Sequence, residues 1–94
     1  MEDEKRKLDL IKTYKCYQDI HKDIEEIIEK ELHSPVYIKP NVIIDYFKLN
    51  QKYKSYHLSQ IRVCIVGVLY NIGYTRWTTS KKKSTYVKKE YIVA

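Results

Sequence analysis

The pattern of hydrophobic and polar positions is clearest between residues 55 and 72. Apolar side chains recur there at steps of three and four, the period of a helix with one buried face. They are Leu58, Ile61, Ile65, Val68, Leu69 and Ile72. Ser55 suits the N-cap of this helix. Gly73 follows the last apolar position, where a C-cap needs a residue that tolerates positive φ. The pattern therefore predicts a helix from Ser55 to Ile72 that ends at Gly73.

Two segments rich in β-branched and aromatic residues follow this helix, at residues 74–79 and 85–92. Such a composition is typical of strands. Between them lies the polar segment 80–84, which carries three lysines. We therefore predict a β-hairpin with a basic tip, fed directly by the preceding helix.

The first third of the chain also has a helical pattern. Residues 4–32 contain no glycine or proline, and their apolar positions alternate steps of three and four. The segment predicts one long helix, or two helices joined near Gln18 and Asp19. Its second part, Ile20 to Leu32, is the more apolar and is expected to be a core helix. Residues 1–18 are expected to form a helical arm, which either projects and packs on a partner or folds back. Residues 19–94 are expected to form the domain.

The middle of the chain predicts a short strand and a second helix. Pro35 ends the first helical region, because a residue before proline is pushed toward extended conformations. Val36–Ile38 has the composition of a short strand. Pro40 and Asn41 then open a helix from Val42 to Leu49, since proline is well placed in a first turn. Its expected buried residues are Ile43, Ile44, Phe47 and Leu49.

The resulting order is helix, short strand, helix, turn, helix, strand, loop, strand. This order predicts an α+β winged helix, in which a helix-turn-helix is followed by a C-terminal hairpin called the wing. A long N-terminal helix precedes it. With 94 residues the chain has room for one domain and a modest core.

Charge divides the chain into two parts. Residues 1–33 carry a net charge of −3 and residues 34–94 a net charge of +9, within a total of +6. The second part holds only 2 acidic residues, and this bias favours a polyanionic partner. The simpler alternative is that the basic surface only keeps the chain soluble.

Several classes of function find little support in the sequence. His21, His33 and His57 are isolated, and Cys16 and Cys64 lie too far apart for a metal motif, so no metal, cofactor or enzymatic activity is expected. No run of about 18 apolar residues predicts a membrane span. The two cysteines within predicted helices indicate a reduced, intracellular protein. No membrane partner is expected.

One run of residues resembles a known family. Tyr53-Lys54-Ser55, Leu58-Ser59-Gln60-Ile61 and the segment from Leu69 to Trp77 are similar to the winged helix at the C-terminus of primase-helicases from phages, mobile elements and large DNA viruses, including the virulence-associated E type. Those domains end their third helix with a run that is matched here by Leu69, Ile72, Gly73, Tyr74 and Arg76. The likeness covers about 60 residues and implies a DNA-binding module in replication or regulation. No GxxxxGK[ST] phosphate loop accompanies it.

The residues expected to contact nucleic acid are Lys52, Lys54, Tyr56, Ser59, Gln60, Arg76, Trp77, Lys81, Lys82, Lys83 and Lys88. Tyr56, Ser59 and Gln60 lie where recognition helices meet base edges, and a glutamine suits adenine. The lysines suit phosphates. Trp77 either packs beneath the hairpin or stacks on unpaired bases, so the choice between single- and double-stranded DNA stays open.

A second class of function is also open. The outer face of the helix at 55–72 carries Val63, Gly67 and Tyr70, an apolar strip that a DNA reader would rarely expose. Tyr14 and Tyr17 line an apolar side of the N-terminal arm. These side chains could dock or inhibit a partner protein, form a homodimer, or attach the chain to a larger replication protein.

Overall fold

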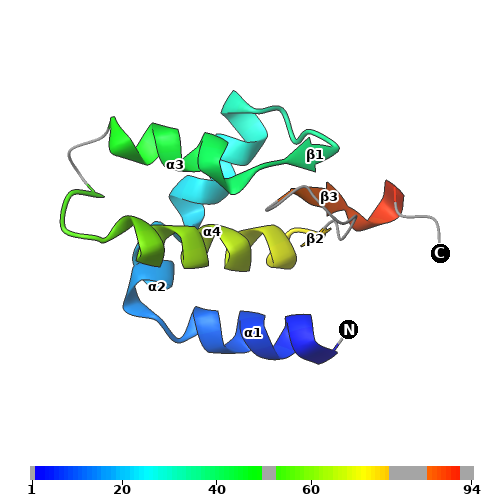
Figure 1. Ribbon diagram of the computed structural model, residues 1–94, viewed down its shortest axis with the longest axis horizontal. Coiled ribbons are helices and arrows are strands. Elements are labelled where there is room, and N and C mark those ends of the chain that lie inside the picture. The colour runs from blue at the N-terminus through cyan, green and yellow to red at the C-terminus, as the bar shows by residue number, and fades with distance from the viewer. Residues whose placement is uncertain (1, 50–52, 77–84, 92–94) are drawn as a thin grey trace.

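The computed structural model describes residues 2–49, 53–76 and 85–91. In chain order their elements are α1 (Glu2–Lys12), α2 (Lys15–Glu26), the π-helical turn η1 (Ile27–Glu31), β1 (Tyr37–Ile38), α3 (Pro40–Lys48), α4 (Leu58–Asn71), β2 (Tyr74–Arg76), β3 (Tyr86–Lys88) and the 3-10 turn η3 (Lys89–Tyr91) (Figure 1). Within the described residues, four α-helices and a three-stranded antiparallel sheet near the C-terminus form a small, compact α+β domain. The α+β class and the order of helices and strands are as predicted.

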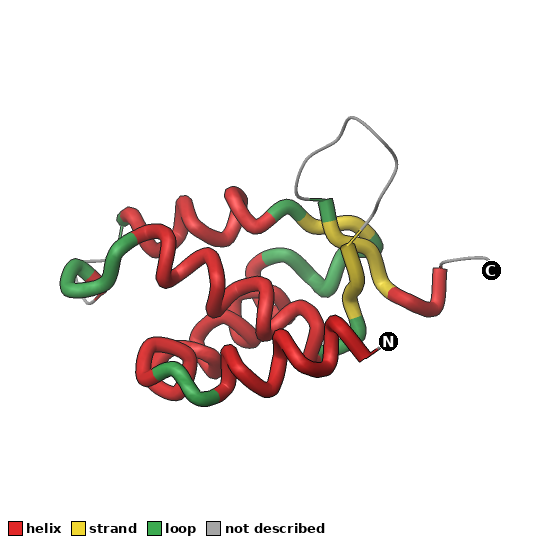
Figure 2. Tube along the Cα trace, turned by 60° about the horizontal axis from the view of Figure 1, so that its bottom comes forward, coloured by secondary structure: helices red, strands yellow, loops and turns green. Residues whose placement is uncertain are grey.

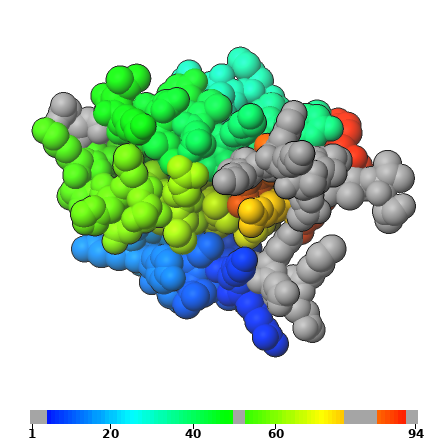
Figure 3. Space-filling model, viewed as in Figure 1, coloured from blue at the N-terminus to red at the C-terminus, as the bar shows by residue number. Residues whose placement is uncertain are grey.

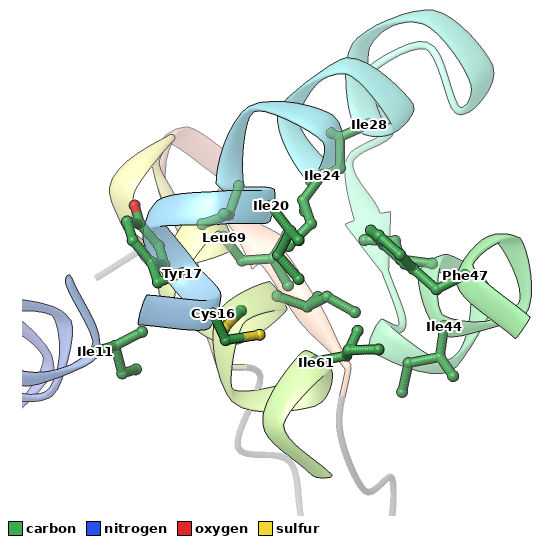
Figure 4. Packing of buried hydrophobic residues seen from close by; sticks show 14 of the residues in the cluster. Ile11, Cys16, Tyr17, Ile20, Ile24, Ile28, Ile44, Phe47, Ile61 and Leu69 are labelled. Carbon is green, nitrogen blue, oxygen red and sulfur yellow. The ribbon is translucent and has the colours of Figure 1, made fainter. Parts of the chain in front are cut away.

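The hydrophobic core is organised around α4. Ile61, Ile65, Val68 and Leu69 are almost completely buried on one face of this helix, as their spacing predicted. Ile20 and Ile24 of α2 pack against them, and α3 adds further apolar side chains (Figure 4). α4 runs between α3 and α1, and α2 crosses behind it (Figure 1). Because three helices pack against α4, the side chains on its open face are held in fixed positions relative to the rest of the domain.

The ends of α4 differ in how well the sequence predicted them. Gly73 has φ +101°, so the predicted positive-φ residue after the helix is confirmed. At the other end the N-cap is His57, and the helix begins at Leu58 instead of Ser55. Leu58 is 46% exposed, although its spacing predicted burial, and Leu49 is 87% exposed beyond the end of α3. Both leucines lie at helix ends that project past the core.

The three strands gather at one end of the helices (Figure 2). Their order is β1-β3-β2, with β3 pairing antiparallel to both neighbours. β3 is shorter than predicted because its neighbour β2 begins at Tyr74, which lies opposite Lys88. The 3-10 turn η3 follows immediately after Lys88. The predicted loop at 80–84 and the end of the first predicted strand lie outside the described residues.

The N-terminal segment differs most from the prediction. The break between its helices lies at Thr13 and Tyr14, five residues before the expected joint, and α2 begins at Lys15. Thr13 Oγ1 donates a hydrogen bond to the Leu10 carbonyl at 2.6 Å, which helps to end α1. α1 then lies alongside α4, and Ile11 is buried. Residues 1–18 were expected to form an arm; in the structure Ile11 and Tyr17 of this segment pack over Gly67 of α4, whereas Leu10 and Tyr14 are exposed.

Candidate nucleic-acid interface

α4 has an exposed face in its first half. Ser59, Arg62 and Val63 are exposed on this face, and Val66 is half-buried one turn further on. In the space-filling view this face lies between α3 on one side and α1 on the other (Figure 3). Arg62 is the one charged residue in the fourteen residues of α4.

The first turn of α4 is capped by a side chain that was predicted to contact a base. Gln60 Oε1 accepts a hydrogen bond from the backbone N–H of His57 at 3.1 Å. This is one half of a capping box, which satisfies an amide that the helix leaves unpaired. A bidentate pair with adenine needs both the oxygen and the amino group of a glutamine. Gln60 can therefore form such a pair only if this cap opens.

The turn that precedes α4 is tied to α2 by two tyrosines. Tyr53 donates a hydrogen bond to Asp23, and Tyr56 donates one to Asp19. The bond to Asp19, with smaller contributions from desolvation and nearby charge, raises the pKa of Tyr56 to about 12. Burial, with Asp23 as the next cause, raises the pKa of Tyr53. The two bonds hold the turn that leads into α4, and the bond to Asp19 also occupies the Tyr56 hydroxyl.

A groove lies between the start of α4 and the start of α2. Its volume is about 630 Å³, and it is lined by Tyr14, Lys15, Cys16, Ser55, Tyr56, Ser59, Gln60 and Val63. Three predicted nucleic-acid contacts, Tyr56, Ser59 and Gln60, thus meet two predicted partner contacts, Tyr14 and Val63. The two sets of residues were expected to serve different purposes, and the fold brings them to one site.

The basic residues of the sheet lie apart from this groove. Arg76 is exposed at the end of β2 and lies opposite Tyr86, whereas Lys88 lies opposite Tyr74. The two cations are therefore two register positions apart on the same face of the sheet, and they do not form a direct cross-strand pair. Lys88 lines a separate cavity beside Gly73, with carboxylates nearby. Lys54 is exposed in the turn before α4.

The remaining predicted contacts, Lys52, Trp77, Lys81, Lys82 and Lys83, lie outside the described residues. Their roles stay predictions.

The apolar strip proposed for a partner is largely covered within the chain. Gly67 is buried, and the nearest side-chain atoms above it belong to Ile11 and Tyr17. Tyr17 is 5% exposed and stacks on His21 with ring centroids 5.0 Å apart, so it offers no surface to a second protein. Tyr70 is half-buried with its ring 5.8 Å from that of Tyr86. Of the four predicted partner residues, Tyr14 and Val63 are the exposed ones.

Arg62 is a site residue that the sequence analysis missed. Its Nη2 donates a hydrogen bond to Asn41 Oδ1 at 2.6 Å, across the junction of α3 and α4. Both side chains are exposed. The signal available in the sequence was the isolation of this arginine among the apolar and small residues of the helix. Its partner, 21 positions away, could not be recognised from spacing.

Neither a metal centre nor a membrane span is found in the part of the chain that the structure describes. No group of three or more His, Cys, Asp or Glu side chains there could hold a metal ion, and none of its helices is long and apolar enough to cross a bilayer. No protein-family model, curated protein or solved structure matches this chain.

Proposed function

We propose that this chain is a DNA-binding module of the winged-helix type, with α4 as its recognition helix and the segment between β2 and β3 as its wing. The order of elements supports the assignment, and so does the antiparallel pairing of β2 with β3, which is the hairpin that a wing requires. The module would serve replication or regulation in a phage, a virus or a mobile element, within the cell and without a cofactor.

One observation carries the proposal. The open face of α4 lies in a stretch, residues 46–89, that holds ten lysines and arginines and no aspartate or glutamate. Most acidic residues of the chain belong instead to α1, α2 and η1, and α2 crosses behind α4 (Figure 1). A surface with one sign of charge raises the local concentration of a polyanion and orients it during encounter. The excess of positive charge in residues 46–89 therefore favours DNA as the partner.

The proposed contacts divide into two kinds. Ser59, Arg62 and Val63 on α4 would face base edges in the major groove, because an α-helix fits that groove. Lys54, in the turn before α4, and Arg76, at the end of β2, would contact phosphates, which fix register without specifying sequence. Lys81, Lys82 and Lys83 are expected to extend the phosphate contacts from the wing.

The test is a salt series with fluorescently labelled DNA in single-stranded, double-stranded and forked forms. We expect the duplex or fork to bind, and log affinity to fall linearly with log salt by roughly 0.9 per phosphate contact. Lys54→Ala and Arg76→Ala should each reduce that slope by about one contact. Lys22→Ala, an exposed position on α2, removes the same charge from the acidic side and should leave the slope unchanged. Absence of binding at low salt contradicts the proposal.

The groove supports one alternative function, the docking of a partner protein. Tyr14 is 41% exposed and Val63 is 38% exposed, and both line the groove at the start of α4. Exposed aromatic and aliphatic side chains around a concave site are typical of protein contacts. Such binding would depend weakly on salt, because apolar contacts are not screened. Tyr14→Ser should weaken a protein contact and leave DNA binding intact, whereas Lys54→Ala should do the reverse.

A further inference from the structure

We propose that Arg62, held in place by Asn41, recognises a guanine base in duplex DNA. The inference rests on the proposed function and adds a base preference and a residue responsible for it. Arg62 is the single cation of α4, and it projects from the open face in the first half of the helix. Recognition helices make their base contacts in these first turns.

The hydrogen bond to Asn41 leaves the guanidinium prepared for a ligand. Four of the five N–H donors of a guanidinium lie along two edges, each of which presents a pair of parallel donors. Nη2 contributes one hydrogen to each edge, and its bond to Asn41 Oδ1 at 2.6 Å uses one of them. One complete two-donor edge therefore stays available. Asn41 is in the first turn of α3, so the bond also restricts a long side chain that would otherwise lose much rotamer entropy on binding.

The neighbours of Arg62 favour a base over a phosphate. One helical turn away on the same face lie Leu58 and Val66, with Val63 beside them. Aliphatic side chains suit base edges and thymine methyl groups, whereas a phosphate site gathers several cations and polar groups. Guanine presents O6 and N7 as adjacent acceptors in the major groove, which match a two-donor edge. The combination of one fixed arginine and an aliphatic surround is thus complementary to a guanine with thymine nearby.

The experiment begins with selection from a pool of randomised duplexes by the full chain and by Arg62→Ala. We expect the wild type to enrich guanine at one position and the variant to lose that preference. In the selected duplex, 7-deazaguanine at this position removes the N7 acceptor. It should lower wild-type affinity about tenfold, since a bidentate base contact carries roughly that discrimination, and it should have no effect on the variant.

Two further variants separate charge from geometry. Arg62→Lys keeps the charge and lacks the planar two-donor edge, so it should retain the salt slope and lose the guanine preference. Asn41→Ala keeps Arg62 and removes the hydrogen bond that holds it, so the guanine preference should weaken without disappearing. Both positions are exposed, and thermal melting by circular dichroism should confirm that the variants fold.

The outcomes separate the inference from the proposed function. If Arg62→Ala weakens binding equally on every sequence and reduces the salt slope, Arg62 contacts a phosphate and the inference is overturned while DNA binding stands. If the variant selects the same sequence as the wild type, the inference is likewise overturned. If the wild type binds no duplex at any salt concentration, the proposed function fails, and the guanine contact with it.

Discussion

Ile11 of α1 lies directly over Gly67 of α4. A β-carbon on Gly67 would come within 2.6 Å of Ile11 Cγ2 and within 3.2 Å of Tyr17 Cε2. Glycine in the interior of a helix costs about 1 kcal/mol relative to alanine. Here the missing side chain allows α1 and α2 to approach α4 closely, and the buried Ile11 side chain offsets that cost.

Gly67→Ala is therefore expected to destabilise the fold despite the better helix propensity of alanine. The β-branched Ile11 has little freedom to turn its methyl group away, so α1 must shift, and such overpacking costs about 1–3 kcal/mol. Chemical denaturation measures the change in the free energy of unfolding. The matched control is Ile11→Ala with Gly67→Ala, in which the clash with Ile11 is gone. The double variant should be more stable than the two single changes predict by addition. Additive effects would contradict direct contact.

Removal of residues 1–14 tests whether α1 belongs to the domain. From the sequence we expected residues 1–18 to be an arm outside the domain formed by residues 19–94. The structure buries Ile11 of α1 over Gly67 of α4, so loss of α1 should lower the free energy of unfolding by about 2 kcal/mol or more, as for other buried isoleucines. Removal of residues 1–5 spares Ile11 and should have little effect. Sedimentation will show whether the uncovered face of α4 causes self-association. Equal stability of the two truncated chains would favour the expectation that residues 1–18 lie outside the domain.

The two cysteines are expected to be unreactive in the folded protein. Cys16 of α2 and Cys64 of α4 are free thiols, and both are buried. Burial raises the pKa of both thiols and so reduces the thiolate that reacts. Ellman's reagent should react slowly with native protein and rapidly after denaturation. Fast reaction of both thiols under native conditions would contradict this packing.

The sequence predicted those features of α4 that depend on short-range pattern. The period of Ile61, Ile65 and Val68 identified the buried face, because a helix that buries one face must repeat apolar residues at its own period. The positive φ of Gly73 followed in the same way from its place after the last apolar position. Both depend on residues within a few turns of one another.

Features that depend on long-range packing could not be predicted in this way. Period alone does not decide whether Leu10 or Ile11 is buried, because that depends on where α1 folds back. The outcome, with Ile11 buried and Leu10 exposed, is set by the opposing Gly67. Gly67 in mid-helix was the available signal of a close approach, and it was interpreted as part of an exposed strip. The bond between Arg62 and Asn41 likewise joins two helices and leaves no periodic trace.

Stability is expected to fall as the pH rises above 10. The bond to Asp19 raises the pKa of Tyr56 from 10.0 in its unperturbed state to about 12. Between these values the folded protein keeps a proton that the unfolded chain has lost, so the stabilising effect is complete below pH 10 and disappears as pH rises through 12. Tyr56→Phe should reduce this dependence and leave the part that Tyr53 contributes, and Asp19→Asn should lower the pKa of Tyr56 measured by phenolate absorbance. An unchanged alkaline titration in Asp19→Asn would exclude the bond as the cause.

Gln60 offers a way to separate folding from base recognition at the start of α4. Its side chain accepts the His57 N–H, so Gln60→Ala removes a cap and should lower the free energy of unfolding by about 1 kcal/mol. Gln60→Glu keeps an acceptor at the same place, adds a charge that the helix N-terminus favours, and should preserve stability. If Gln60 acts as a cap, DNA binding by Gln60→Ala should be close to that of the wild type at a temperature where both are folded. If Gln60 instead pairs with adenine, the alanine variant should lose affinity for one sequence without losing stability. Thermal melting and DNA titration on the same two variants decide between these roles, because a cap affects the first measurement and a base contact affects the second.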